Sequence, residues 1–221
     1  MRTVYGVAAG FELLLVVICA LRAPKRKSEL AKVVCLYEWL VVFCGLSFFT
    51  YVYGKNASIA TAGKSLMFAS LDWIFFLFMA YTQRYTALFR PKKLAKQGMF
   101  VWNTINTIVY LINIRQHQIF QVNLQGTEDR VLQNGPMAWW MWVNTLYCAV
   151  ILALLLISYC CMILQASHIY LIHYEAIGAT LLLGIILRMI PGRFRTIYDI
   201  SFLVFGLMSM FVYYFTFCYI S

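Results

Sequence analysis

The chain has 221 residues, of which 63% are hydrophobic, and its mean hydropathy is +0.77. Soluble domains are only about 45–50% apolar, so the composition excludes an ordinary water-soluble fold. A net charge of +10 would suggest nucleic-acid binding in a soluble protein. Here the basic residues lie mainly in two short loops between apolar runs, and we therefore expect no nucleic-acid partner.

Seven apolar runs are predicted to form helices that cross a lipid bilayer. A bilayer core of about 30 Å needs roughly 20 apolar residues, and a helix satisfies its own backbone groups in hydrocarbon. None of the four prolines interrupts a run, so each helix is expected to be continuous. The predicted spans are residues 4–21, 33–53, 64–82, 98–113, 137–164, 174–190 and 197–220. The predicted fold class is an all-α membrane protein, a single domain of seven transmembrane helices over residues 1–221.

The first predicted span contains two features of interest. Gly6 and Gly10 have the spacing that lets two helices approach closely, which is compatible with a homodimer. Glu12 lies near the middle of the span, and ionisable groups inside a membrane are costly and often functional. Glu12 is therefore a candidate ligand-binding residue. Glu38 and Glu175 lie nearer the inner ends of their spans and are expected to reach the membrane interface.

The orientation of the predicted bundle follows from the distribution of Lys and Arg. Cytoplasmic loops are enriched in these residues, and the loops after the first and third spans are the most basic. We therefore expect the N-terminus outside and the C-terminus in the cytoplasm, although the turn after the sixth span is also basic. An aromatic cluster at the predicted outer start of the fifth span agrees with this orientation; it consists of Trp139, Trp140 and Trp142.

The third and fourth spans carry the most suggestive polar groups. Asp72 lies near the middle of the third span, next to Trp73, and Ser65 lies seven residues earlier on the same helix face. The fourth span has a polar stripe whose spacing places it on one helix face; it consists of Asn103, Asn106, Tyr110 and Asn113. Two interpretations stay open. The stripe and Asp72 either line a ligand pocket or only join helices through interhelical hydrogen bonds. In the first case the pocket residues are Asp72, Trp73, Asn106, Tyr110, Asn113 and Glu12.

The remaining residues indicate structural roles. Arg188 and Asp199 flank the turn between the last two spans and are predicted to form an ion pair that fixes this turn. All seven cysteines lie in apolar runs without a C-x-x-C motif, so we interpret them as packing residues. The chain has no H-E-x-x-H, P-loop or G-x-S-x-G motif, and its last span has no lysine for a retinal Schiff base. We expect no catalytic activity and no metal site, and the sequence identifies no cofactor.

Three stretches of the chain carry a family resemblance. The first includes Leu21-Arg22, Glu38-Trp39-Leu40 and Ala80-Tyr81-Thr82-Gln83-Arg84-Tyr85-Thr86; the second is Gly135-Pro136-Met137-Ala138-Trp139-Trp140; the third runs from Tyr198-Asp199 to Gly206-Leu207. With these features the chain resembles the seven-transmembrane N-terminal sensor region of bacterial histidine kinases and diguanylate cyclases. The resemblance implies signal transduction of the two-component type across a bacterial cytoplasmic membrane. Such regions usually continue into a kinase, cyclase or PAS module, whereas this sequence stops at Ser221. The output module would then act in cis or in trans.

The sequence thus favours a sensory or receptor input domain that binds a small ligand or membrane signal and passes it to a cytoplasmic kinase or cyclase. A second hypothesis is a small transporter or proton- or cation-coupled subunit that uses Glu12 and Asp72. A third is a non-catalytic membrane assembly subunit, in which the polar groups serve helix packing alone.

Overall fold

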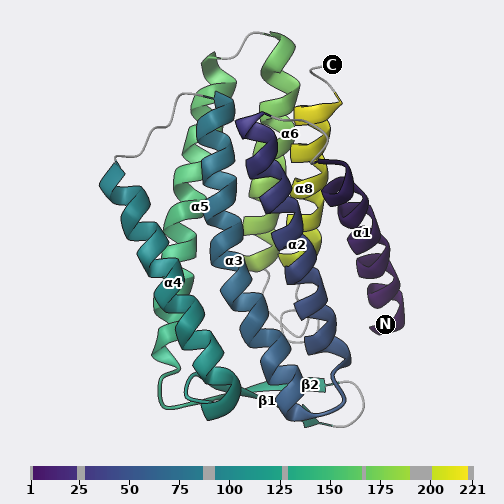
Figure 1. The fold of residues 1–221 in the computed structure, drawn as a ribbon, viewed down its shortest axis with the longest axis vertical. Helices are drawn as coiled ribbons and strands as arrows, with labels where there is room; N and C mark the ends of the chain where they lie inside the picture. Colours follow the sequence, from purple (N-terminus) through teal and green to yellow (C-terminus); the bar gives the residue numbers. More distant parts are fainter. Residues whose placement is uncertain are drawn as a thin grey trace.

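A computed structural model describes residues 2–23, 28–86, 93–125, 129–165, 168–189 and 201–218. These residues form seven α-helices and one β-hairpin: α1 (Arg2–Arg22), α2 (Glu29–Tyr53), α3 (Ala57–Thr86), α4 (Lys93–Gln116), β1 (Phe120–Gln125), β2 (Asp129–Asn134), α5 (Trp139–Gln165), α6 (His168–Met189) and α8 (Ser201–Phe217). Consecutive helices alternate in direction; α1 begins toward the hairpin end of the bundle, and α8 ends at the opposite end (Figure 1). The predicted helical fold class is confirmed, and each predicted span overlaps one helix.

Three of the described helices are long and apolar enough to cross a membrane: α2, α3 up to Tyr85, and α5. The described parts of α6 and α8 contain shorter apolar segments, Tyr170–Leu183 and Val204–Phe217. The polar stripe of α4 makes this helix less apolar than α5. The structure therefore supports three membrane-length helices, fewer than the seven predicted spans, and these three indicate a membrane protein.

The side chains are distributed as expected for helices that face an apolar solvent. Many large apolar residues are exposed on the outer faces of α1, α2, α4 and α5, for example Phe11, Leu46, Ile108 and Leu146. The polar side chains of Glu38, Asp72 and Asn106 are instead buried in the bundle. Exposed apolar surface of this extent marks an interaction surface in a soluble protein, and here lipid chains would cover it.

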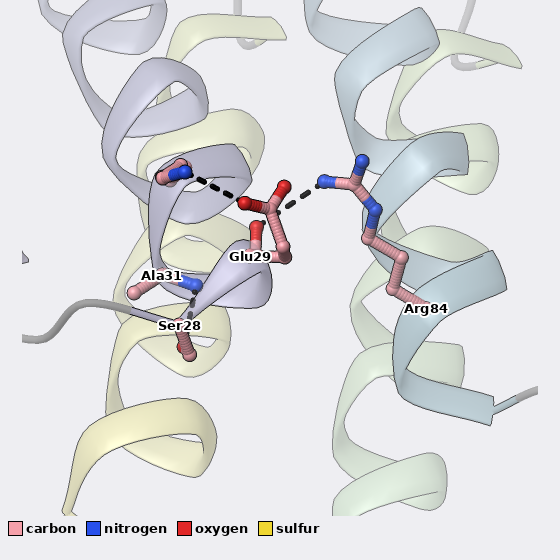
Figure 2. Close-up of polar contacts among 5 residues, drawn as sticks. Ser28, Glu29, Ala31 and Arg84 are labelled. Carbon is pink, nitrogen blue, oxygen red and sulfur yellow. Dashed lines mark hydrogen bonds and ion pairs between the residues drawn. The ribbon is translucent and has the colours of Figure 1, made fainter.

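Polar contacts connect the start of α2 with the end of α3 (Figure 2). Ser28 is the N-cap of α2, and its hydroxyl accepts a hydrogen bond from the Ala31 N–H at 3.0 Å. The carboxylate of Glu29 pairs with Lys32 at 2.6 Å on the same helix. Arg84 near the end of α3 donates to the main-chain oxygen of Glu29 at 3.2 Å. Of these contacts only the exposed Arg84 bond joins the two helices, at the end of the bundle opposite the hairpin.

The contact between α2 and α3 is the most extensive between two described elements. It is close because Gly63 of α3 lies directly on the α2 backbone. A Cβ at this position would lie 2.8 Å from both the Ser47 oxygen and the Thr50 carbonyl carbon. Small residues allow helices in a membrane to approach in this way.

Residues 114–125 and 129–136 lie between the fourth and fifth predicted spans, where no helix was expected, and they contain further secondary structure. Helix α4 continues to Gln116, and β1 and β2 form an antiparallel pair from Phe120↔Asn134 to Gln125↔Asp129. Successive strand residues point to opposite faces, and Phe120 and Val122 are accordingly buried. β1 alternates apolar and polar residues as a half-buried strand does, whereas β2 is mostly polar; both strands have only six residues, and sequence analysis did not distinguish them from a loop.

Of two predictions about helix contacts, only the first concerns residues that the structure describes. The Gly6 and Gly10 face of α1 packs against α2, where Gly6 meets Tyr53 and Gly10 lies near Phe49. The motif thus serves a contact within the chain. The predicted ion pair involves Asp199 and the side chain of Arg188, which lie outside the described residues.

Candidate functional site

Asp72 lies at the centre of a buried hydrogen-bond network that joins α3, α4 and α5. Its side chain has no exposed surface. Asn106 of α4 donates its amide to one carboxyl oxygen, and Cys148 of α5 donates its thiol to the other at 3.2 Å. Asn103 of α4 donates to the main-chain oxygen of Asp72 at 3.1 Å. Two amides of the predicted α4 stripe therefore contact the same residue of α3.

A second set of hydrogen bonds connects the α4 stripe to α5. Asn106 also donates to the side-chain oxygen of Asn144 at 3.1 Å, and its own oxygen accepts from the Trp140 indole N–H at 2.6 Å. The hydroxyl of Tyr147 donates to the oxygen of Asn103 at 2.8 Å. We call Asp72, Asn103, Asn106, Asn144 and Cys148 the Asp72 network. Each of its members is bonded to a neighbouring helix.

The aromatic candidates lie around this network in different ways. The indole N–H of Trp73 donates to Thr107 of α4 at 2.9 Å and is therefore directed away from the Asp72 carboxyl. Tyr110 is buried, stacks on Phe68 with ring centroids 5.5 Å apart, and brings its hydroxyl beside the Asn144 amide. Tyr110 thus belongs to the surroundings of Asp72, whereas Trp73 braces α3 against α4.

Asn113, the last member of the α4 stripe, holds the hairpin. Its oxygen accepts from the Ile119 N–H at 2.7 Å and from the Phe120 N–H at 3.3 Å. Its nitrogen donates to the Phe120 oxygen at 3.1 Å and to Ser65 of α3 at 3.2 Å. Thr61 of α3 accepts from the Val122 N–H at 2.9 Å. Asn113 is therefore separate from Asp72, but it lies on the helix face that contacts Asp72.

Glu12 lies far from these residues, between α1 and α8. A Cβ placed on Gly206 of α8 would overlap the Glu12 carboxyl group, which shows how closely that group is packed. The structure therefore divides the six candidate residues into three groups: those at or beside the Asp72 network, Asn113 at the hairpin, and Glu12 at α8.

The expectation that Glu38 reaches the membrane interface is wrong. Glu38 has no exposed surface, and its carboxyl accepts a hydrogen bond from Ser209 of α8. Only a neighbour 171 residues away reveals this role, so no local sequence signal could have indicated it. Glu175, in contrast, is exposed on α6.

Sequence reasoning also missed the α5 members of the network. Asn144 and Cys148 are spaced four residues apart, which places them on one helix face. Each is a single polar or weakly polar residue in an apolar run, and Cys148 was interpreted as a packing residue. The four-residue spacing is the signal that a search for polar faces in each span would have found.

The chemistry of the Asp72 network is that of a carboxyl group held by neutral donors. The carboxyl of Asp72 is bonded by the Asn106 amide and the Cys148 thiol, and no described basic side chain pairs with it. With its amide turned, Asn144 would donate to both Asp72 oxygens, at 3.1 and 3.3 Å. Asn144 can therefore accept from a protonated Asp72 or donate to an ionised one. The network is suited to holding a polar group or a proton within the bundle.

The described helices and this buried polar core define a helical membrane protein with three helices of membrane length. No protein-family model and no curated protein matches the chain, so no family is identified.

Proposed function

We propose that the protein is a sensory or receptor domain of a bacterial cytoplasmic membrane. All seven helices cross the bilayer, with the hairpin outside and the end of α8 in the cytoplasm. A small ligand or membrane signal acts on the hairpin and the Asp72 network, and α8 passes the change to a kinase or cyclase module in cis or in trans. The chain acts without catalysis of its own.

One observation carries this proposal: the hairpin and the buried Asp72 are held by the same face of α4. Asn113 bonds the hairpin backbone, and Asn106 bonds Asp72 seven residues earlier on that helix. Seven residues correspond to about 10 Å along a helix. A ligand that moves the hairpin therefore acts through α4 on contacts in the middle of the bundle. The ligand must favour one arrangement of these contacts over another.

The charge distribution supports the proposed orientation. At the end opposite the hairpin, the described helices carry Arg22, Lys32, Arg84 and Lys96, whereas the described segments at the hairpin end carry Lys55 and Arg115. Cytoplasmic membrane edges are enriched in such residues. At the hairpin end, Trp139 and Trp142 are exposed on the first turn of α5, as expected for side chains at a headgroup region.

The transport hypothesis receives less support from the structure. Glu12 lies against α8 and Asp72 lies between α3, α4 and α5, so the two carboxyls belong to different helix contacts. A shared ion path would require them to face a common route. Ion flux into proteoliposomes that is lost in both Glu12→Gln and Asp72→Asn would nevertheless favour transport over sensing.

The receptor proposal is tested by ligand-dependent thermal unfolding of the full chain in lipid nanodiscs. A compound at 100 times its Kd stabilises the folded state by about 2.7 kcal/mol. For a chain of this size, that corresponds to a rise in Tm of about 5 to 10 °C. We expect at least one small polar metabolite to give such a shift with the wild type and a much smaller shift with Asp72→Asn.

The matched control is Ile105→Leu, which changes an exposed position on the same helix and should respond as the wild type does. A broad metabolite screen without any shift would count against the receptor proposal. A shift of equal size in wild type and Asp72→Asn would leave a receptor whose ligand does not use the Asp72 network.

A further inference from the structure

The face of α8 that packs into the bundle is held by polar contacts at two of three successive positions. Phe202, Gly206 and Ser209 have the four- and three-residue spacing of a single helix face, which we call the α8 docking face. Phe202 stacks on Phe48 of α2 at 5.7 Å and fills the space over Gly45. The next two positions meet carboxyl groups: Gly206 meets Glu12 of α1, and Ser209 bonds Glu38 of α2.

Both carboxyl groups are enclosed. Glu12 is 9% exposed and Glu38 has no exposed surface. Among the described residues, Glu12 Oε2 and Glu38 Oε1 are buried and have no hydrogen-bond partner. Two acids from different helices therefore meet α8 through their carboxyl groups, and each keeps one buried oxygen without a partner among the described residues.

No described cation compensates these acids. Four titratable side chains interact electrostatically with Glu38, and none of them is basic: Cys19 of α1, Cys35 and Tyr37 of α2, and Tyr213 of α8. Against Glu12 lie Gly206 and Leu207 of α8, which carry no charge, and the Leu207 backbone N–H hydrogen-bonds the Glu12 carboxyl. The nearby basic residues have other contacts or positions: Lys32 pairs with Glu29, Arg84 donates to the Glu29 oxygen, and Arg22 lies exposed at the end of α1.

A carboxylate in such surroundings is strongly disfavoured. Enclosing an ion without a counter-charge costs several kcal/mol, whereas a neutral carboxylic acid loses far less on burial. The packing of α8 seen here is therefore compatible with protonated Glu12 and Glu38. Loss of either proton would create a buried charge that no described cation compensates, and movement of α8 would expose that charge to water.

We propose that Glu12 and Glu38 form a proton-sensitive latch that holds α8 when both acids are neutral and releases it when they ionise. The direction follows from the balance of charges. The docked state binds more protons than the released state, so docking is favoured at low pH and is lost as the pH rises. The role of the latch in signalling rests on the proposed function, because α8 is the helix proposed to carry the signal. The docking equilibrium itself does not depend on a ligand or an output module.

The test is backbone hydrogen exchange of the full chain in nanodiscs, measured for residues 201–217 at several values between about pH 6 and pH 9. Each rate is divided by the intrinsic exchange rate at that pH. For the wild type we expect protection of α8 to fall by about tenfold or more across this range. The double variant Glu12→Gln, Glu38→Gln keeps neutral side chains of nearly the same shape, and its α8 should stay protected at every pH.

Glu175→Gln, on the exposed face of α6, is the matched control and should behave as the wild type does. The single variant Glu38→Gln provides a second test if the double variant does not fold. Protection of α8 that is independent of pH in the wild type would overturn the latch. So would an equal fall in the wild type and the glutamine variants. These outcomes differ from failure of the receptor proposal, which is read from ligand-dependent unfolding at a fixed pH.

Discussion

Replacement of Gly63 by alanine tests the close packing of α2 on α3. A Cβ at this position would lie 2.8 Å from backbone atoms of Ser47 and Thr50, which cannot rotate away as a side chain can. The Tyr51 backbone nitrogen would lie closer still, and an ordinary contact begins at 3.4 Å, so the helices would have to separate by more than about 0.6 Å at this point. Gly98 of α4 provides the matched comparison, because a Cβ there would meet nothing within 4 Å.

The two substitutions should have opposite signs. Alanine improves helix propensity by up to about 1 kcal/mol relative to glycine, and Gly98→Ala should be stabilising by that amount or less. Overpacking of a close contact typically costs about 1–3 kcal/mol. Gly63→Ala should therefore be destabilising by a net amount of about 1–2 kcal/mol.

The free energy of unfolding can be measured by titrating SDS into detergent micelles while following helix content by circular dichroism. Gly63→Ala that is as stable as Gly98→Ala would refute the reasoning, because the close backbone contact between α2 and α3 would then be absent. Both proteins carry the same change of residue type, so differences in the unfolded state largely cancel.

Three further substitutions test how much individual polar contacts contribute to the stability of the bundle, the hairpin and the helix ends. Asn106→Leu should lower the free energy of unfolding by about 2–4 kcal/mol in the same assay, because Asp72 and the Trp140 N–H lose their Asn106 partner. A loss of stability no larger than that of Ile105→Leu would contradict this prediction. Asn113→Ala removes three side-chain contacts to the hairpin backbone, and hydrogen exchange of residues 120–134 should rise by about tenfold while α6 is unchanged. Arg84→Ala should alter stability by less than about 0.5 kcal/mol, because its bond to the Glu29 oxygen is exposed; a larger loss would show that this contact fixes the end of the bundle.

The polar stripe of α4 shows how far sequence reasoning reaches. Helix periodicity placed Asn103, Asn106 and Asn113 on one face, and the structure has all three directed at neighbouring elements. Periodicity could not show that these residues have different partners. Asn113 lies about 10 Å along the helix from Asn106, and there it meets the hairpin. The ligand-binding roles of these residues stay predictions.

The apolar runs, the missing internal prolines and the residue spacing determined the helices and the face that each polar residue occupies. These properties are local, because a helix forms from residues close together in the sequence, and its periodicity fixes the side of the helix from which each side chain projects. Tertiary structure alone decided which carboxyl groups are enclosed and by what. Glu38 meets Ser209, and Glu12 meets Gly206, across most of the length of the chain. The burial of a charge depends on which helices become neighbours, and that arrangement comes from long-range packing of apolar surfaces and small residues that no single segment contains.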